Sequence, residues 1–155
     1  MFTITTNSPE QTSLLGEKIA NLIQDNLIIC LEGDLGAGKT LFTQSLCKAL
    51  KVKEIVTSPT FNLMNVYEGK QRIYHFDLYR LNDPYELELM GIRDYLETPN
   101  AFFLFEWPSK GGDEIPPADL IIEIKKSEDE LSRTATLSSS SVALQQALEQ
   151  QFNHA

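Results

Sequence analysis

The sequence lacks long apolar runs and has few cysteines. A membrane-spanning helix needs about 20 consecutive apolar residues, and no stretch of the chain approaches that length. The amino-terminal residues also lack the basic region of a secretory signal, so we expect a cytoplasmic protein with no membrane association. The two cysteines, Cys30 and Cys47, have no partners at metal-ligand spacing. We expect them to be small core residues rather than a disulfide.

Positive charge is also scarce. Against 22 acidic residues the chain has 13 lysines and arginines, for a net charge of −9. A protein that binds nucleic acid unaided usually carries a basic face, so in a nucleic-acid pathway we expect another subunit to hold the polymer. The rest of the composition is ordinary for a globular protein. At 155 residues and 42% hydrophobic content, we expect one domain, 1–155, with a buried core.

One motif has a clear chemical function. Residues 33–40 read G-D-L-G-A-G-K-T and follow the apolar run 27–31, the pattern of a phosphate-binding loop between a strand and a helix. Its glycines let successive backbone N–H groups point at phosphate oxygens, and the helix adds the positive end of its dipole. Lys39 supplies a positive charge for the β- and γ-phosphates, and the Thr40 hydroxyl is suited to ligate Mg²⁺. The motif predicts nucleoside triphosphate binding.

The hydrophobic pattern predicts an α/β fold with two antiparallel hairpins. Ser8, Pro9 and Gln11 form a strong helix start, and Asp83 with Pro84 forms another. The continuous apolar run 101–105 is typical of a buried strand. A Gly/Pro-rich loop is expected over 109–117. The predicted helices span 9–24, 39–50, 84–96 and 142–152, and the predicted strands span 2–5, 27–31, 62–67, 72–78, 101–105, 120–124 and 134–137.

Two carboxylates follow apolar strands. Glu106 comes directly after the run 101–105, and Asp77 ends the run 73–76. Ligands of parallel sheets gather at the carboxyl ends of the strands, so Glu106 is the first candidate for an acid that binds Mg²⁺ or water. Asp77 is the candidate to support the metal or position the water. The alternative for each is a strand-end cap or a solvated carboxylate.

Four other features have more open interpretations. The segment 57–60 places three hydroxyls around a proline and is either a switch loop that senses the γ-phosphate or a plain turn. Arg80 fits a surface ion pair better than a charge-stabilising role. His75, within a strand, fits a packed or hydrogen-bonded residue better than a ligand. Trp107 is either a core residue or a lid over the site.

Several motifs together resemble one protein family. In order, they are G-D-L-G-A-G-K-T at 33–40, S-P-T-F at 58–61, H-F-D-L-Y-R-L at 75–81, M-G-I-R-D-Y at 90–95 and E-W-P at 106–108. The combination closely resembles the bacterial TsaE (YjeE) family over nearly the whole chain. The resemblance implies a P-loop NTPase-like three-layer fold, with a mixed sheet that has a parallel core and antiparallel hairpins.

The resemblance also implies a function. Family members are ATPases needed for the threonylcarbamoyl modification of adenosine 37 in tRNAs that read codons starting with A. They act with the partner proteins TsaD and TsaB, so tRNA would be contacted only through the complex. The implied ligands are ATP and Mg²⁺.

The resemblance assigns roles to residues as well. Lys39, Asp77 and Glu106 would be catalytic, with Thr40 and Glu106 as the metal-associated residues. Trp107 matches the tryptophan beside the family's acid, and the segment 58–60 matches a switch-like loop. The implied nucleotide-binding residues are Gly33, Asp34, Gly36, Ala37, Gly38, Lys39, Thr40, Leu41 and Arg133. Leu41 departs from the family, in which many relatives carry a second threonine.

Two other functions fit a phosphate-binding loop. A small metabolite kinase would need an arginine-rich lid to neutralise the transferred phosphate, but the segment 108–117 contains Lys110 as its one basic residue. A nucleotide-dependent switch with negligible turnover would have much the same sequence as a slow ATPase.

Overall fold

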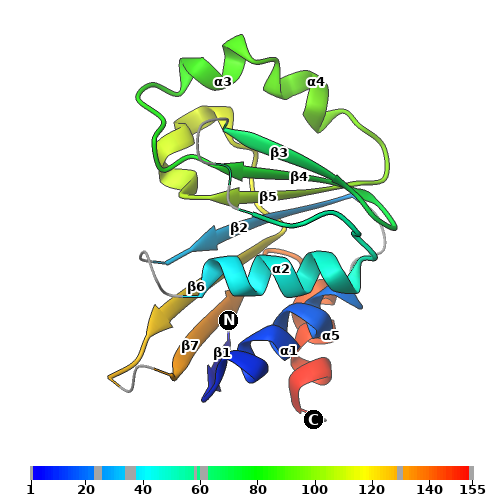
Figure 1. Cartoon of the computed structure of the whole chain (residues 1–155), viewed down its shortest axis with the longest axis vertical. Coiled ribbons are helices and arrows are strands. Elements are labelled where there is room, and N and C mark those ends of the chain that lie inside the picture. Colours follow the sequence, from blue (N-terminus) through cyan, green and yellow to red (C-terminus); the bar gives the residue numbers. More distant parts are fainter. Residues whose placement is uncertain are drawn as a thin grey trace.

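The chain is built on a seven-stranded sheet with the strand order β1-β7-β6-β2-β5-β4-β3 (Figure 1). The computed structural model describes residues 2–22, 26–33, 38–57, 59, 63–128 and 131–153. The elements in chain order are β1 (Phe2–Thr6), α1 (Pro9–Ala20), β2 (Leu27–Glu32), α2 (Lys39–Ala49), β3 (Met64–Glu68), β4 (Arg72–Asp77), α3 (Tyr85–Leu89), α4 (Ile92–Leu96), β5 (Ala101–Glu106), the 3₁₀ helix η1 (Pro108–Glu114), β6 (Leu120–Lys126), β7 (Arg133–Ser138) and α5 (Val142–Asn153).

The centre of the sheet is parallel and its edges are antiparallel. Strands β6, β2, β5 and β4 run in the same direction, whereas β3 pairs antiparallel with β4, and β7 pairs antiparallel with both β6 and β1. This arrangement confirms the predicted mixed sheet. Because β2, β5 and β4 are parallel neighbours, their carboxyl ends meet at one edge, where ligands of such sheets usually bind.

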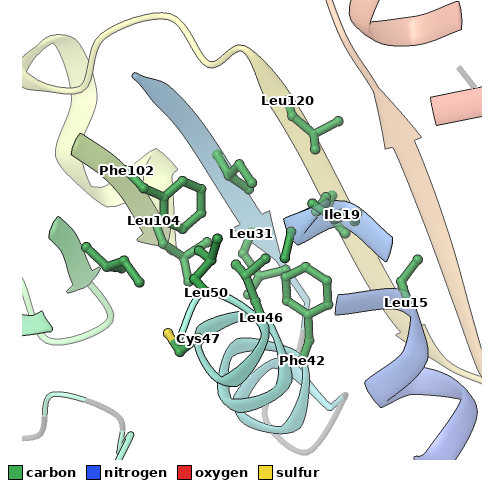
Figure 2. Close-up of a cluster of buried hydrophobic side chains, with 14 of the residues drawn as sticks. Leu15, Ile19, Leu31, Phe42, Leu46, Cys47, Leu50, Phe102, Leu104 and Leu120 are labelled. Carbon is green, nitrogen blue, oxygen red and sulfur yellow. The ribbon is translucent and has the colours of Figure 1, made fainter. Parts of the chain in front are cut away.

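Buried side chains form a cluster on each face of the sheet. One cluster joins the sheet to α1, α2 and α5, and Figure 2 shows its centre, where Phe42 and Leu46 of α2 face Leu31 and Leu104. The other cluster joins the sheet to α3, α4 and the segment after β5. Strand β5, covered on both sides, is buried at every position. The predicted three-layer, P-loop NTPase-like α/β fold is therefore confirmed.

The start of α1 follows the predicted cap. Ser8 Oγ accepts a hydrogen bond from the Gln11 N–H at 3.2 Å, and Gln11 Oε1 accepts one from the Asn7 N–H at 2.7 Å. These bonds satisfy donors that a helix start leaves unpaired. The prediction that α1 extends to residue 24 was too long, because the described helix ends at Ala20.

Two other predictions of local structure were wrong. The single helix predicted over 84–96 is two short helices, α3 and α4, because Gly91 between them adopts a left-handed φ of 82° that ends the first. The loop predicted over 109–117 contains η1, which begins at Pro108. Cys30 and Cys47 are buried free thiols, as predicted. None of the helices in the described part of the chain has the length and apolarity needed to cross a bilayer.

Candidate nucleotide site

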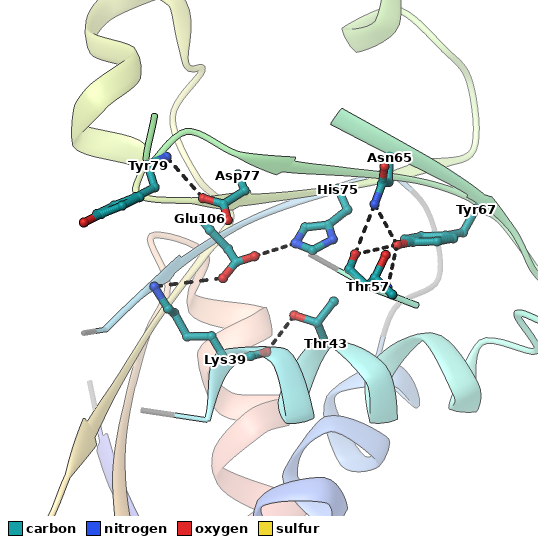
Figure 3. Close-up of polar contacts among 9 residues, drawn as sticks. All are labelled: Lys39, Thr43, Thr57, Asn65, Tyr67, His75, Asp77, Tyr79 and Glu106. Atoms are coloured by element: carbon teal, nitrogen blue, oxygen red, sulfur yellow. Dashed lines mark hydrogen bonds and ion pairs between the residues drawn. The ribbon is translucent and has the colours of Figure 1, made fainter. Parts of the chain in front are cut away.

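The two candidate carboxylates lie side by side at the carboxyl edge of the sheet. Asp77 is the last residue of β4 and Glu106 the last of β5, and the two are register partners. Glu106 is also the register partner of Leu31 on β2, the strand that leads into the glycine-rich segment. The parallel register therefore brings both acids to the end of the strand that precedes the predicted phosphate-binding loop (Figure 3).

Lys39 contacts the acid of β5. It is the first residue of α2 and is only 6% exposed. Its Nζ lies 3.9 Å from Glu106 Oε1 and 4.3 Å from the centre of the Trp107 ring. A buried ammonium needs such partners, because a carboxylate balances its charge and an aromatic face attracts a cation. Trp107 follows Glu106 with a left-handed φ of 56°, an uncommon conformation for a bulky residue and one that recurs at functional sites.

Glu106 is held from a second side by His75. Its Oε2 lies 2.6 Å from His75 Nε2, and the two residues are 3% and 1% exposed. The carboxylate thus has one oxygen toward a histidine and the other toward a lysine (Figure 3). His75 was expected to be packed or hydrogen-bonded, and it is both.

Asp77 lies in a more open environment than Glu106. Burial raises the pKa of its carboxyl, and the nearby Glu106 charge raises that pKa further; the Tyr79 N–H, His75 and Lys39 act in the opposite direction. Asp77 Oδ1 accepts the hydrogen bond from the Tyr79 N–H at 3.1 Å. The site therefore combines one nearly inaccessible carboxylate with one that remains partly open to solvent.

The glycine-rich segment meets α2 at a glycine in a left-handed conformation. Gly38, directly before α2, has a left-handed φ of 104° that favours glycine. A Cβ built on Gly38 would lie 3.8 Å from both Arg133 Nε and Thr12 Cγ2, so both side chains lie beside the end of the loop. Arg133 is the first residue of β7, and its contact with a nucleotide stays a prediction, whereas Thr12 had no distinguishing signal in the sequence. The predicted nucleotide contacts Asp34, Gly36 and Ala37 lie outside the described residues.

Two further predicted nucleotide-binding residues, Thr40 and Leu41, lie at the start of α2. Thr40 is exposed, one residue after Lys39, and Leu41 is half-buried beside it. Thr43 Oγ donates to the Lys39 carbonyl at 2.8 Å, within the first turns of the helix. A helix start next to a lysine and two carboxylates offers N–H donors, one positive charge and oxygen ligands, which suit the phosphates and Mg²⁺ of a nucleotide.

The predicted switch-like segment is described only in part. Ser58 and Thr60 lie outside the described residues, but Thr57 is anchored through its backbone. Its N–H donates to Tyr67 Oη at 3.2 Å, and its carbonyl accepts from Tyr67 Oη at 2.9 Å and from Asn65 Nδ2 at 3.0 Å. Strand β3 therefore fixes the point at which this segment begins. Arg80 is exposed beyond β4, in agreement with a surface role.

Within the described ranges, no group of three or more histidine, cysteine, aspartate or glutamate side chains is arranged to hold a metal. A nucleotide-associated Mg²⁺ is typically bound by one or two protein oxygens together with phosphates and water. Thr40, Glu106 and Asp77 supply hard oxygen ligands of that kind. The cation–π contact between Lys39 and Trp107 was missed in the sequence, because only the fold brings α2 against the residue after β5.

Comparisons with known proteins identify relatives of this chain. A family model described as threonylcarbamoyl adenosine biosynthesis protein TsaE matches residues 6–135. The tRNA threonylcarbamoyladenosine biosynthesis protein TsaE of Haemophilus influenzae is 41% identical over 138 residues, which cover 83% of this chain and 86% of the relative. The protein of the same name from Aquifex aeolicus is 42% identical over 121 residues, covering 76% of this chain and 82% of the relative.

A solved structure extends the similarity to the fold. The crystal structure of Bacillus subtilis YdiB matches with a TM-score of 0.79 at 28% identity, covering 99% of this chain and 95% of that one. The motifs quoted from the sequence, which run from residue 33 to residue 108, all lie within the region that the family model matches. This chain therefore belongs to the TsaE family.

Proposed function

We propose that this chain is a Mg²⁺-dependent ATPase that acts in the biosynthesis of tRNA threonylcarbamoyladenosine. The observation that carries the proposal is the convergence of Lys39, Glu106 and Asp77 at the carboxyl ends of neighbouring parallel strands, directly beside a phosphate-loop sequence. The names of the relatives support the pathway. The site chemistry and the family resemblance support ATP hydrolysis and the metal, and the family resemblance supports the partner proteins.

Lys39 has a different partner before and after nucleotide binding in this proposal. In the present structure its ammonium pairs with Glu106 and lies over Trp107. The triphosphate offers a stronger anion next to the amides at the start of α2, so Lys39 turns from Glu106 to the β- and γ-phosphates. Arg133, beside Gly38, adds a second positive charge at the loop.

The carboxylates act on the other reactants. Thr40 and Glu106 would hold Mg²⁺, which when bound neutralises charge that builds up on the phosphates. Asp77, the more open acid, orients water for attack on the γ-phosphate. Burial of Lys39 and Glu106 excludes bulk water around them, which strengthens each charge–charge interaction.

TsaD and TsaB are the proposed partners. A net charge of −9 gives this chain little attraction for a phosphate backbone. An ATPase that regulates a complex needs no direct contact with tRNA, so the partners would hold the RNA.

The kinase alternative has little support. The segment 108–117, which leaves the site after Trp107, contains one basic residue, Lys110, and that side chain lies over the Tyr79 ring. The switch alternative differs from the ATPase only in turnover, so measured phosphate release with ATP and Mg²⁺ separates the two.

The proposal is tested by calorimetry with ATP and Mg²⁺. Lys39→Ala is expected to lose the heat of association that the wild-type chain gives, because the phosphates lose their buried cation. Lys48→Ala, an exposed substitution at the other end of α2, is the matched control and is expected to bind as the wild type does. Equal ATP affinity in the Lys39→Ala and wild-type chains would reject the loop assignment.

A further inference from the structure

Among the described residues at the site, His75 is a buried titratable residue to which the proposed mechanism gives no task. Side chains alternate along a strand, so His75 and Asp77 of β4 lie on the same face as Glu106 of the neighbouring β5. His75 is the register partner of Leu104, and Glu106 lies two residues further along β5, so the imidazole reaches its carboxylate diagonally.

The hydrogen bonding of His75 indicates why a polar side chain occupies this buried position. An ionised carboxylate only accepts, so the hydrogen in the 2.6 Å contact is assigned to His75 Nε2. His75 Nδ1 is buried and has no hydrogen-bond partner in the described part of the chain. An unpaired buried polar atom costs stability, so an apolar residue would serve better if this position only filled the core. The hydrogen bond to Glu106 is the interaction that an apolar residue could not make.

The same contact leaves Glu106 with a partner when a nucleotide draws Lys39 away. Glu106 is 3% exposed, and in the present structure its two oxygens face His75 and Lys39. When Lys39 turns to the phosphates, Glu106 loses one of these partners, and a buried carboxylate without partners is strongly destabilising. His75 remains bonded to Oε2 and leaves Oε1 directed toward the place that Lys39 has vacated.

We propose that His75 is a positioning residue: its Nε2–H holds the Glu106 carboxylate so that Oε1 faces the phosphate site throughout turnover. The proposal rests on the ATPase function proposed above. Hydrogen-bonding partners that orient metal-associated ligands typically change activity or metal affinity by about 10- to 100-fold when they are removed. His75 acts through Glu106 and does not touch the nucleotide, so its loss lowers kcat and leaves the affinity for ATP nearly unchanged.

The test compares His75→Met with His75→Gln. Glutamine places an N–H donor near the position of Nε2, whereas methionine has a similar length and no donor. His75→Met is expected to lower kcat by about 10-fold or more, and His75→Gln is expected to recover at least about a third of the wild-type kcat, with ATP affinity by calorimetry within about threefold for both. Tyr74→Phe is the control, because it removes a partly buried hydroxyl contact with Thr98 from the opposite face of the same strand.

A second measurement uses the nucleotide-free wild-type chain. Imidazole ¹⁵N shifts are expected to show a hydrogen on His75 Nε2 and a bare Nδ1; the chain has one other histidine, His154, and the His75→Gln spectrum assigns the signals. The Nδ1–H tautomer would overturn the proposal. So would equal kcat in the His75→Met and wild-type chains, or equal losses in the methionine and glutamine variants. Absent hydrolysis in the wild-type chain would instead reject the proposed ATPase function.

Discussion

At the residue scale, the site separates two neighbouring carboxylates by their surroundings. Glu106 is buried between His75 and Lys39, whereas Asp77 is half-buried and bonded to the Tyr79 backbone. Two acids in different environments commonly take different roles in one reaction. We propose that the enclosed acid binds the metal and that the open acid orients the attacking water.

Glu106→Gln and Asp77→Asn are each expected to lower ATP turnover at least about tenfold, because aligned charges and water supply several kcal/mol of barrier lowering. Phosphate release under saturating ATP and Mg²⁺ measures the effect. Glu97→Gln, an exposed substitution after α4, controls for loss of charge alone. Wild-type turnover in either site variant would remove that residue from the proposed mechanism.

Asp77→Asn is also expected to stabilise the fold at neutral pH. Burial and the Glu106 charge raise the pKa of Asp77 from its ordinary value of 3.8, so the folded chain takes up the proton more readily than the unfolded chain. As the pH rises from the ordinary value of 3.8 through the raised pKa of the folded chain, the ionised carboxylate destabilises the folded state. Asparagine does not ionise and so avoids this loss of stability.

Urea unfolding of both chains, from a pH below the ordinary value of 3.8 up to neutral pH, tests this sign. The stability advantage of Asp77→Asn is expected to grow as the pH rises through the raised pKa and to level off above it. An advantage that shrinks as the pH rises would contradict the assignment of a raised pKa.

The residues of the site were predictable to the extent that a motif or a strand end marked them. Lys39 and Glu106 had such signals, and the structure brings them into contact. The contacts of His75 with Glu106 and of Trp107 with Lys39 were not predictable, since both depend on which strands are neighbours and on how α2 crosses them. Thr12, beside Gly38, depends on the packing of α1 in the same way.

At the element scale, α2 is held in place by close contact with α1. Gly16 of α1 lies at this contact, where a built Cβ would be 2.9 Å from the Phe42 carbonyl oxygen and 3.0 Å from the Leu46 nitrogen. Both atoms belong to the α2 backbone, which cannot move aside as a side chain can. Because Lys39 begins α2, this crossing also sets the position of the site lysine.

Gly16→Ala is expected to lower the free energy of unfolding by about 1–2 kcal/mol, since overpacking costs about 1–3 kcal/mol and the better helix propensity of alanine returns at most about 1. Urea denaturation measures the change. Glu17→Ala, the exposed neighbour in α1, is expected to stay within about 0.5 kcal/mol of the wild type. An unchanged or raised stability in Gly16→Ala would show that the two helices have room to separate.

The same scale shows where sequence patterns predict elements well. The apolar run that became β5 and the cap at Ser8 have strong local causes, and the structure contains both. The break between α3 and α4 also has a local cause, the glycine at position 91. The apolar periodicity over 84–96 favoured a single helix, so this glycine was not read as a helix end. Strand order is different, because the placement of β2 between β5 and β6 depends on long-range packing that no local pattern encodes.

At the scale of the whole molecule, the sheet architecture bears on the nucleotide site and the net charge bears on RNA binding. The three-layer fold builds one polar site at the carboxyl edge of its parallel strands, and the net charge of −9 disfavours direct tRNA binding. Membership of the TsaE family supports a role in the biosynthesis of tRNA threonylcarbamoyladenosine.

This chain is expected to bind purified TsaD and TsaB when ATP and Mg²⁺ are present and to show no measurable affinity for tRNA alone at physiological salt, because it lacks the excess of basic residues that such binding requires. Analytical ultracentrifugation of the mixed proteins tests the first expectation, and a filter-binding titration with tRNA tests the second. If neither partner binds with or without ATP, the complex-subunit proposal is wrong.

The central claim is that Lys39 and the start of α2 receive a triphosphate beside Glu106 and Asp77. A crystal structure with a non-hydrolysable ATP analogue and Mg²⁺ tests it most directly. We predict Lys39 Nζ at hydrogen-bonding distance from the β- and γ-phosphate oxygens, with the metal next to Thr40 and Glu106. A structure in which Lys39 still pairs with Glu106 while the analogue lies elsewhere would contradict the account.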